Sequence, residues 1–264
     1  MTALALLTAS ACCHATWNLL MKTVSTKGSA FIWLCGLLTL PVSVVLLVRS
    51  DDLAVTWWPA LISMALHTLY AVTLQKAYGA ADFATVYPIS RGSAPVLVAL
   101  ATVSGWRVYA GALIVLPGVL VMDRLHRGRT LARGIALGLL VAACTAAYTL
   151  WDAYAIGTLH ADLLAYLAVS NLAQVVVLSV LSRDRRAALG EWRRAIPVAI
   201  LVPASYGLSL LALSYASVSA VAVGRTMNVV IGALLGFLVL HERATRTRLA
   251  GLAAVVAGVV LVSI

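Results

Sequence analysis

The sequence predicts an all-α integral membrane protein with ten transmembrane helices, arranged as two inverted five-helix repeats around a central cavity. Hydrophobic residues make up 62% of the 264 residues and charged residues only 11%, more apolar surface than a soluble domain of this length can bury. The apolar residues also fall into runs of about 20, the length that an α-helix needs to cross a bilayer. The runs of the second half resemble those of the first.

Ten runs account for nearly the whole chain, and the short connections leave no room for a folded domain outside the membrane. The first five runs are 2–21, 29–48, 57–75, 81–103 and 108–122, and the second five are 134–151, 163–181, 195–214, 217–240 and 249–264. The first run has no basic residue ahead of it and continues past its small residues, so we interpret it as a spanning helix and not as a signal peptide.

Three matches between the halves indicate a repeat. The matched sets are Ala77 and Tyr78 with Ser214 and Tyr215, Gly111 and Gly118 with Gly251 and Gly258, and Cys13 and Trp17 with Cys144 and Tyr148. Because five is odd, the second copy must enter the membrane from the opposite side. We therefore divide the chain into repeats at 1–125 and 126–264, with a substrate site near the midplane between them. The glycines also permit close helix contact, within one chain or in a dimer.

Basic residues are concentrated in the loops after odd-numbered runs, and these loops are expected to face the cytoplasm. Both termini would then lie on the outer side. This placement explains the net charge of +10 as loop anchoring and gives no reason to expect nucleic acid as a partner. The opposite side carries Arg49 and Arg107, whereas the basic loops carry Lys22, Lys27, Lys76, Arg124, Arg127, Arg129, Arg133, Arg183, Arg185, Arg186, Arg193, Arg194, Arg243, Arg246 and Arg248.

The stretch 87–95, Tyr-Pro-Ile-Ser-Arg-Gly-Ser-Ala-Pro, places an arginine and two prolines inside an apolar run. A guanidinium at the bilayer centre costs at least about 2.5 kcal/mol, so Arg91 is expected to face protein or a water-filled cavity. The other ionisable residues inside the runs are His14, His67 and Arg225. No Asp or Glu is expected deep in a run, since Asp152 and the other acids fall near run ends, within reach of headgroup water.

Arg91 and Arg225 occupy comparable places in the two halves. Aligning Tyr78 with Tyr215 puts Asn228 opposite Arg91 and Arg225 about one turn away. Two such cations facing one cavity favour a carboxylate or phosphate. The alternative for each arginine is a structural bond to carbonyls freed by a broken helix, or a side chain that extends to the interface.

Two aromatic and polar faces are expected to complete the cavity. His14, Trp17 and Asn18 share one face of the first run, since they are spaced i, i+3 and i+4. Tyr87 shares the face of Arg91, and Tyr148 and Trp151 lie three residues apart in the sixth run. His14 would supply a titratable group for possible proton coupling. Interhelical hydrogen bonding of His14 and core packing of Trp17 are the alternatives.

Enzyme motifs are absent from the sequence. There is no nucleophile elbow, no Walker loop and no pair of deep carboxylates, and the cysteines lack metal-ligand spacing with a histidine. We expect no enzyme, no catalytic residue, no cofactor and no metal.

Three segments resemble the ten-helix, EamA-type bacterial branch of the drug/metabolite transporter superfamily. They are 14–22, His-Ala-Thr-Trp-Asn-Leu-Leu-Met-Lys, the stretch 87–95, and His241-Glu242-Arg243 ahead of the glycine-spaced last run. The resemblance implies a basket-shaped fold of two inverted repeats in the bacterial inner membrane, opened alternately to each side. It also implies export of amino acids and related metabolites, or exchange of phosphorylated compounds as in eukaryotic relatives.

Two departures from the family pattern affect the function. Gly105-Trp106-Arg107 replaces a Gly-Glu pair between the fourth and fifth runs, and His14 stands where small multidrug resistance relatives carry a glutamate. Loss of that acid argues against export of lipophilic cations. We therefore expect a secondary transporter of amino acids or related zwitterionic or anionic metabolites, working by efflux and sufficient as a monomer. The alternatives are a multidrug or cation exporter, if Asp152 reaches the cavity, and a lipid-translocating protein.

Overall fold

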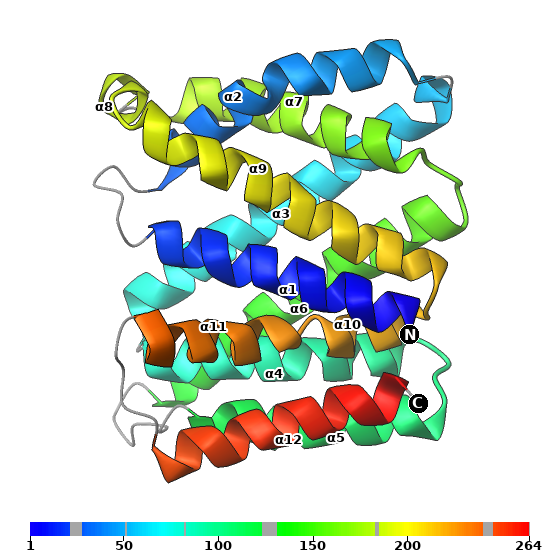
Figure 1. Cartoon of the computed structure of the whole chain (residues 1–264), viewed down its shortest axis with the longest axis vertical. Helices are drawn as coiled ribbons and strands as arrows, with labels where there is room; N and C mark the ends of the chain where they lie inside the picture. Colours follow the sequence, from blue (N-terminus) through cyan, green and yellow to red (C-terminus); the bar gives the residue numbers. More distant parts are fainter. Residues whose placement is uncertain are drawn as a thin grey trace.

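The computed structural model describes residues 1–21, 28–50, 52–81, 83–122, 131–182, 185–239 and 245–263, which form a bundle of α-helices with no strand among them (Figure 1). The motif residues His241, Glu242 and Arg243 and the loop residues Lys22, Lys27, Arg124, Arg127, Arg129 and Arg183 lie outside the described residues. The helices are α1 (Thr2–Met21), α2 (Ser29–Val48), α3 (Leu53–Ala80), α4 (Phe83–Ala101), α5 (Trp106–Met122), α6 (Leu131–Gly157), α7 (Leu163–Leu181), α8 (Arg185–Leu189), α9 (Trp192–Leu211), η1 (Ala212–Ser214), α10 (Val218–Gly224), α11 (Met227–Val239) and α12 (Arg246–Ser263).

Seven described segments are long and apolar enough to cross a membrane: α1, α2, α6, α7, α9 with η1, α10 with α11, and α12. Helix α5 is apolar but shorter, and α4 contains Arg91 and two prolines, which lower its mean hydropathy. The prediction of an all-α, multi-pass membrane protein is confirmed.

Helix α3 is longer than its predicted run at 57–75, and two further differences affect the polar regions. The ninth run is not one helix, because the chain breaks at Arg225 and Thr226 between α10 and α11. Helix α6 extends to Gly157, past the predicted end of the sixth run at residue 151. Both differences change the surroundings of a charged side chain.

The bundle is built from four main contacts between the first and second halves of the chain. Helix α1 packs on α9 and α11, α6 packs on α3 and α4, α2 packs on α7, and α5 packs on α12. The α2–α7 pair and the α5–α12 pair lie at opposite ends of the bundle, and both chain termini lie at the same side (Figure 1). The largest apolar core joins α5 and α12 to α4, α10 and α11.

The α5–α12 contact brings backbone against backbone. A Cβ atom on Gly111 would lie 2.7 Å from the carbonyl oxygen of Gly258, and a Cβ on Gly258 would lie 2.7 Å from the carbonyl oxygen of Gly111. Two turns further, a Cβ on Gly118 would lie 3.0 Å from the Gly251 carbonyl oxygen. The small-residue faces noted in the sequence are therefore used inside one chain.

The α2–α7 contact is polar. Asn171 donates from Nδ2 to the carbonyl of Gly36 at 3.2 Å and to Ser43 Oγ at 3.0 Å. A half-buried amide in such a place fastens two apolar helices in a defined register.

Candidate functional site

A cavity lies where α4, α6 and the break between α10 and α11 meet. It encloses an empty volume of about 450 Å³, including the part open to the outside. Four of the residues predicted for the substrate site line it, together with small and apolar neighbours: Arg91, Tyr148, Arg225 and Asn228 among Ala94, Pro95, Val98, Thr145, Thr149, Ala222, Thr226 and Val229. The alignment of the two halves had related Arg91, Arg225 and Asn228, and all three line this one cavity.

The backbone of α4 is polar at the cavity wall. Pro95 has no N–H, so the carbonyl of Arg91, four residues earlier, loses its helical donor. Nearby, a Cβ on Gly92 would lie 3.0 Å from Leu116 of α5, so α4 and α5 approach closely behind the cavity. The sequence of α4 thus combines close packing on one face with freed polar groups on the other.

The break between α10 and α11 presents Arg225 and Asn228 to the cavity. The amide of Asn228 donates to the Arg225 carbonyl at 3.2 Å and the amide of Val229 donates to the Thr226 carbonyl at 2.9 Å, bonds that span three residues instead of four. Thr226 Oγ1 also donates to the Val223 carbonyl at 2.6 Å. Helix α10 ends and helix α11 starts here, so the carbonyl end of one and the amide end of the other lie together at the cavity wall and their dipoles oppose each other.

The two guanidinium groups lie against aromatic rings. Arg91 donates from Nη2 to the Tyr70 hydroxyl at 3.1 Å and lies 5.7 Å from the ring centroid of Tyr87. Arg225 lies 5.7 Å from the ring centroid of Tyr148, and the rings of Tyr70 and Tyr148 meet edge to face at 5.5 Å. Among the described residues, neither guanidinium donates to a backbone carbonyl, the structural role considered for each. Within the part of the chain that the structure describes, Arg91 donates only to Tyr70 and Arg225 donates no hydrogen bond.

The three residues predicted to form the α1 face of the site, His14, Trp17 and Asn18, are not among the residues that line the cavity. The rings of His14 and Trp17 meet edge to face at 5.0 Å, and His14 interacts electrostatically with Arg91 and Arg225. Trp17 packs against the apolar core formed by α2, α8 and α9, as core packing would require. Asn18 donates from Nδ2 to the His14 carbonyl at 2.8 Å within its own helix.

Trp151 lies outside the cavity lining. Its Nε1 donates to the Pro59 carbonyl at 2.9 Å, and its ring meets that of Trp58 edge to face at 6.0 Å. Trp151 therefore fastens α6 to α3. Its assignment to the substrate, like those of Trp17 and Asn18, stays a prediction.

The expectation that no acid lies deep in the bundle is wrong. Asp152 is only 1% exposed because α6 continues past it to Gly157 and because hydroxyl groups of three other helices bond to its carboxylate. Those groups belong to Ser63, Tyr166 and Tyr206. Asp152 is not among the residues that line the cavity. The signal available in the sequence was its spacing of four from Tyr148, which places both on one face of α6.

Comparison with known proteins agrees with this fold. A solved structure described as "Crystal structure of protein" superimposes with a TM-score of 0.80 at 16% identity, covering 99% of this chain and 96% of that chain. The search of curated proteins found no match. The model of the EamA-like transporter family matches residues 132–264, just over half of the chain. The chain therefore belongs to the EamA-like transporter family, whose members are small-molecule transporters of the drug/metabolite transporter type and not enzymes.

Proposed function

We propose that this chain is a secondary transporter of small metabolites that carry a carboxylate, with amino acids as the leading class and efflux as its direction. Membership of the family supports small-molecule transport across a membrane. The observation that carries the finer proposal is the convergence of Arg91 and Arg225 on one cavity. Two guanidinium groups that line one cavity form a positive site for a single anionic group.

The shape of the cavity supports a small substrate. Tyr148 supplies an aromatic wall and Asn228 an amide beside the arginines, while Ala94, Val98 and Ala222 supply apolar contact. A compound with a carboxylate and a short apolar side chain satisfies both kinds of surface. A phosphorylated metabolite offers the same anionic chemistry, so the experiment below includes both.

Alternating access by two inverted repeats, 1–125 and 126–264, is the proposed mechanism. The contact pattern supports it, since α1 packs on α9 and α11 as α6, its counterpart, packs on α3 and α4. Location in the bacterial inner membrane with both termini on the outer side follows from the loop charges and the bacterial branch of the family. The cavity lies between helices of both halves, where rocking would expose it to each side in turn.

Thermal unfolding of the detergent-purified protein with defined ligands tests the site. The panel contains amino acids, organic anions, phosphorylated metabolites and quaternary ammonium cations. Because a ligand that binds only the folded state stabilises it, by about 2.7 kcal/mol at a hundred times Kd, the true class raises the unfolding temperature. Arg107→Leu, at an exposed arginine beside Trp106, is the matched control for Arg91→Leu.

We expect carboxylates to stabilise the wild type and Arg107→Leu but not Arg91→Leu. Stabilisation by quaternary cations that persists in Arg91→Leu would contradict the proposal and favour a cation exporter. Counterflow of the stabilising compound in liposomes then measures transport itself. Outward movement from loaded cells distinguishes efflux from uptake.

A further inference from the structure

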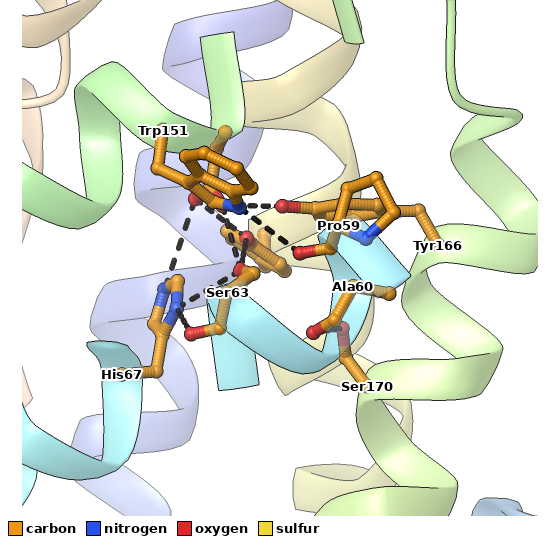
Figure 2. A network of polar contacts seen from close by, with 9 residues as sticks. Pro59, Ala60, Ser63, His67, Trp151, Tyr166 and Ser170 are labelled. Atoms are coloured by element: carbon orange, nitrogen blue, oxygen red, sulfur yellow. Dashed lines mark hydrogen bonds and ion pairs between the residues drawn. The ribbon is translucent and has the colours of Figure 1, made fainter. Parts of the chain in front are cut away.

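The buried carboxylate of Asp152 gathers hydrogen bonds from three helices. Oδ1 accepts from Ser63 Oγ at 2.6 Å and from the Tyr166 hydroxyl at 2.7 Å, and Oδ2 accepts from the Tyr206 hydroxyl at 2.6 Å. Figure 2 shows Ser63 and His67 on α3 facing Trp151 of α6 and Tyr166 of α7 across this network. These hydroxyl groups already solvate the charge, so the carboxylate does not need a further partner for stability alone.

A histidine nevertheless faces the same carboxylate. His67 Nδ1 lies 2.9 Å from the Ser63 carbonyl oxygen, an atom that can only accept, so Nδ1 carries the hydrogen. In the neutral ring Nε2 then presents a lone pair toward Asp152 Oδ2, 4.0 Å away. Two acceptors that face each other repel, and a proton between them removes the repulsion.

We propose that His67 Nε2 and Asp152 Oδ2 form a proton-binding site that holds one exchangeable proton, and that this proton is bound together with the anionic substrate; the second part rests on the proposed function. The side chain of Asp152 is 2% exposed and that of His67 is 30% exposed. The imidazole is therefore the more exposed member of the pair.

The charged groups around the pair determine the sign of the coupling. The ring of His67 stacks on Tyr148 with centroids 4.1 Å apart, and Arg225 lies over that same Tyr148 ring. Arg91 is linked to the same Tyr148 ring through Tyr70. The phenols of Tyr166 and Tyr206 donate directly to the carboxylate. The proton site and the anion site therefore share Tyr148 as a common wall.

The charge balance predicts that anion and proton bind cooperatively. With the proton bound, the His67–Asp152 pair is neutral overall and the field of the two arginines acts fully on the anion. Without it, the pair carries one negative charge that repels the anion across Tyr148. By linkage, an anion that binds better to the protonated protein must itself draw in a proton. The sign does not depend on the direction of transport.

The proton site is tested first without any ligand. Unfolding temperatures of the wild type, Asp152→Asn and Tyr166→Phe are compared from about pH 6 to about pH 9, where an ordinary aspartate stays ionised. A titrating pair makes the difference between wild type and Asp152→Asn change with pH. Tyr166→Phe removes one donor to the carboxylate but keeps the pair, so its difference from the wild type should stay nearly constant. A constant difference for Asp152→Asn as well would overturn the site and leave Asp152 a structural tie.

The coupling is tested by adding an L-amino acid mixture to protein in weakly buffered detergent solution with a pH indicator. We expect proton uptake in the wild type and its loss in Asp152→Asn and His67→Gln, with the mixture still raising the unfolding temperature of both variants. Stabilisation of the wild type without proton uptake, or with proton release, overturns the coupling. Absence of stabilisation by the mixture counts against the proposed amino-acid function, while the pH comparison still decides the proton site.

Discussion

The cavity and the Asp152 network are two polar regions of one apolar bundle, and they treat charge in opposite ways. Among the described residues, three hydroxyl groups donate to the Asp152 carboxylate, whereas Arg91 donates to one phenol and Arg225 lies against a ring. Protein hydroxyl groups hold the Asp152 carboxylate in place, so the exchange proposed there is that of one proton with His67. The two arginines lack such a set of protein partners and are therefore suited to bind an anionic ligand reversibly.

The largest expected effect is the loss of stability when Asp152 is replaced. Asp152→Ala leaves three hydroxyl groups without their acceptor, and at about 1 kcal/mol each the loss should approach roughly 3 kcal/mol. Thermal unfolding without ligand measures it. Ser170→Ala is the control, because Ser170 makes a 3.3 Å bond to the Ala60 carbonyl beside the network (Figure 2); an equal loss in both variants would remove the distinction.

Arg225→Leu should weaken anion binding and leave stability nearly unchanged. Loss of charge-assisted bonds to an anion, about 1.5–3 kcal/mol, weakens binding roughly tenfold to hundredfold. The unfolding temperature without ligand should change little, since the guanidinium donates no hydrogen bond among the described residues. Ligand-dependent unfolding and direct titration measure the two effects. A strong loss of stability with unchanged affinity would make Arg225 a structural residue.

A smaller effect is expected where the two regions adjoin. Tyr70→Phe removes the acceptor of Arg91 but keeps the ring that meets Tyr148. The loss of one hydrogen bond, about 1 kcal/mol, should weaken anion binding by roughly fivefold because Arg91 is held less firmly. The matched control is Tyr109→Phe, because the Tyr109 hydroxyl donates to the Thr102 carbonyl away from the cavity. Its affinity for the anion should equal that of the wild type.

The smallest effect is expected at Trp151. Trp151→Phe removes the bond to the Pro59 carbonyl and should lower stability by about 1 kcal/mol. Stabilisation by a bound amino acid should be unchanged, because Trp151 does not line the cavity. Reduced affinity in a variant that is otherwise stable would restore the predicted substrate role of this side chain.

Helical periodicity and the alignment of the two halves grouped four residues that line the cavity, but they did not reveal the partners of Asp152. Arg91, Tyr148, Arg225 and Asn228 could be grouped because the halves align and each helix has a regular repeat of side-chain directions. The partners of Asp152 come from three other helices, and no spacing in the sequence records which faces of α3, α7 and α9 meet α6. The end of α6 was also predicted too early, since the charge of Asp152 resembled a headgroup residue.

The broken helix shows a second limit of local patterns. Helix α4 contains Pro88 and Pro95 and stays continuous, whereas the chain breaks at Arg225 and Thr226 without a proline. Gly224, directly before the break, lies close to α1, since a Cβ there would lie 2.5 Å from Leu7. Glycine and threonine are weak helix formers, so the break falls at residues that disfavour a helix although no proline marks it.

The glycine contact between α5 and α12 has a mechanical consequence. Side chains between two helices can change rotamer and so let the helices slide, but two backbones in direct contact have no such freedom. One helix comes from each half of the chain, so α5 and α12 should keep their relative position while other helix–helix contacts between the halves rearrange. Spin labels placed on α5 and α12 should keep a constant separation through the transport cycle, and labels on α1 and α6 should not.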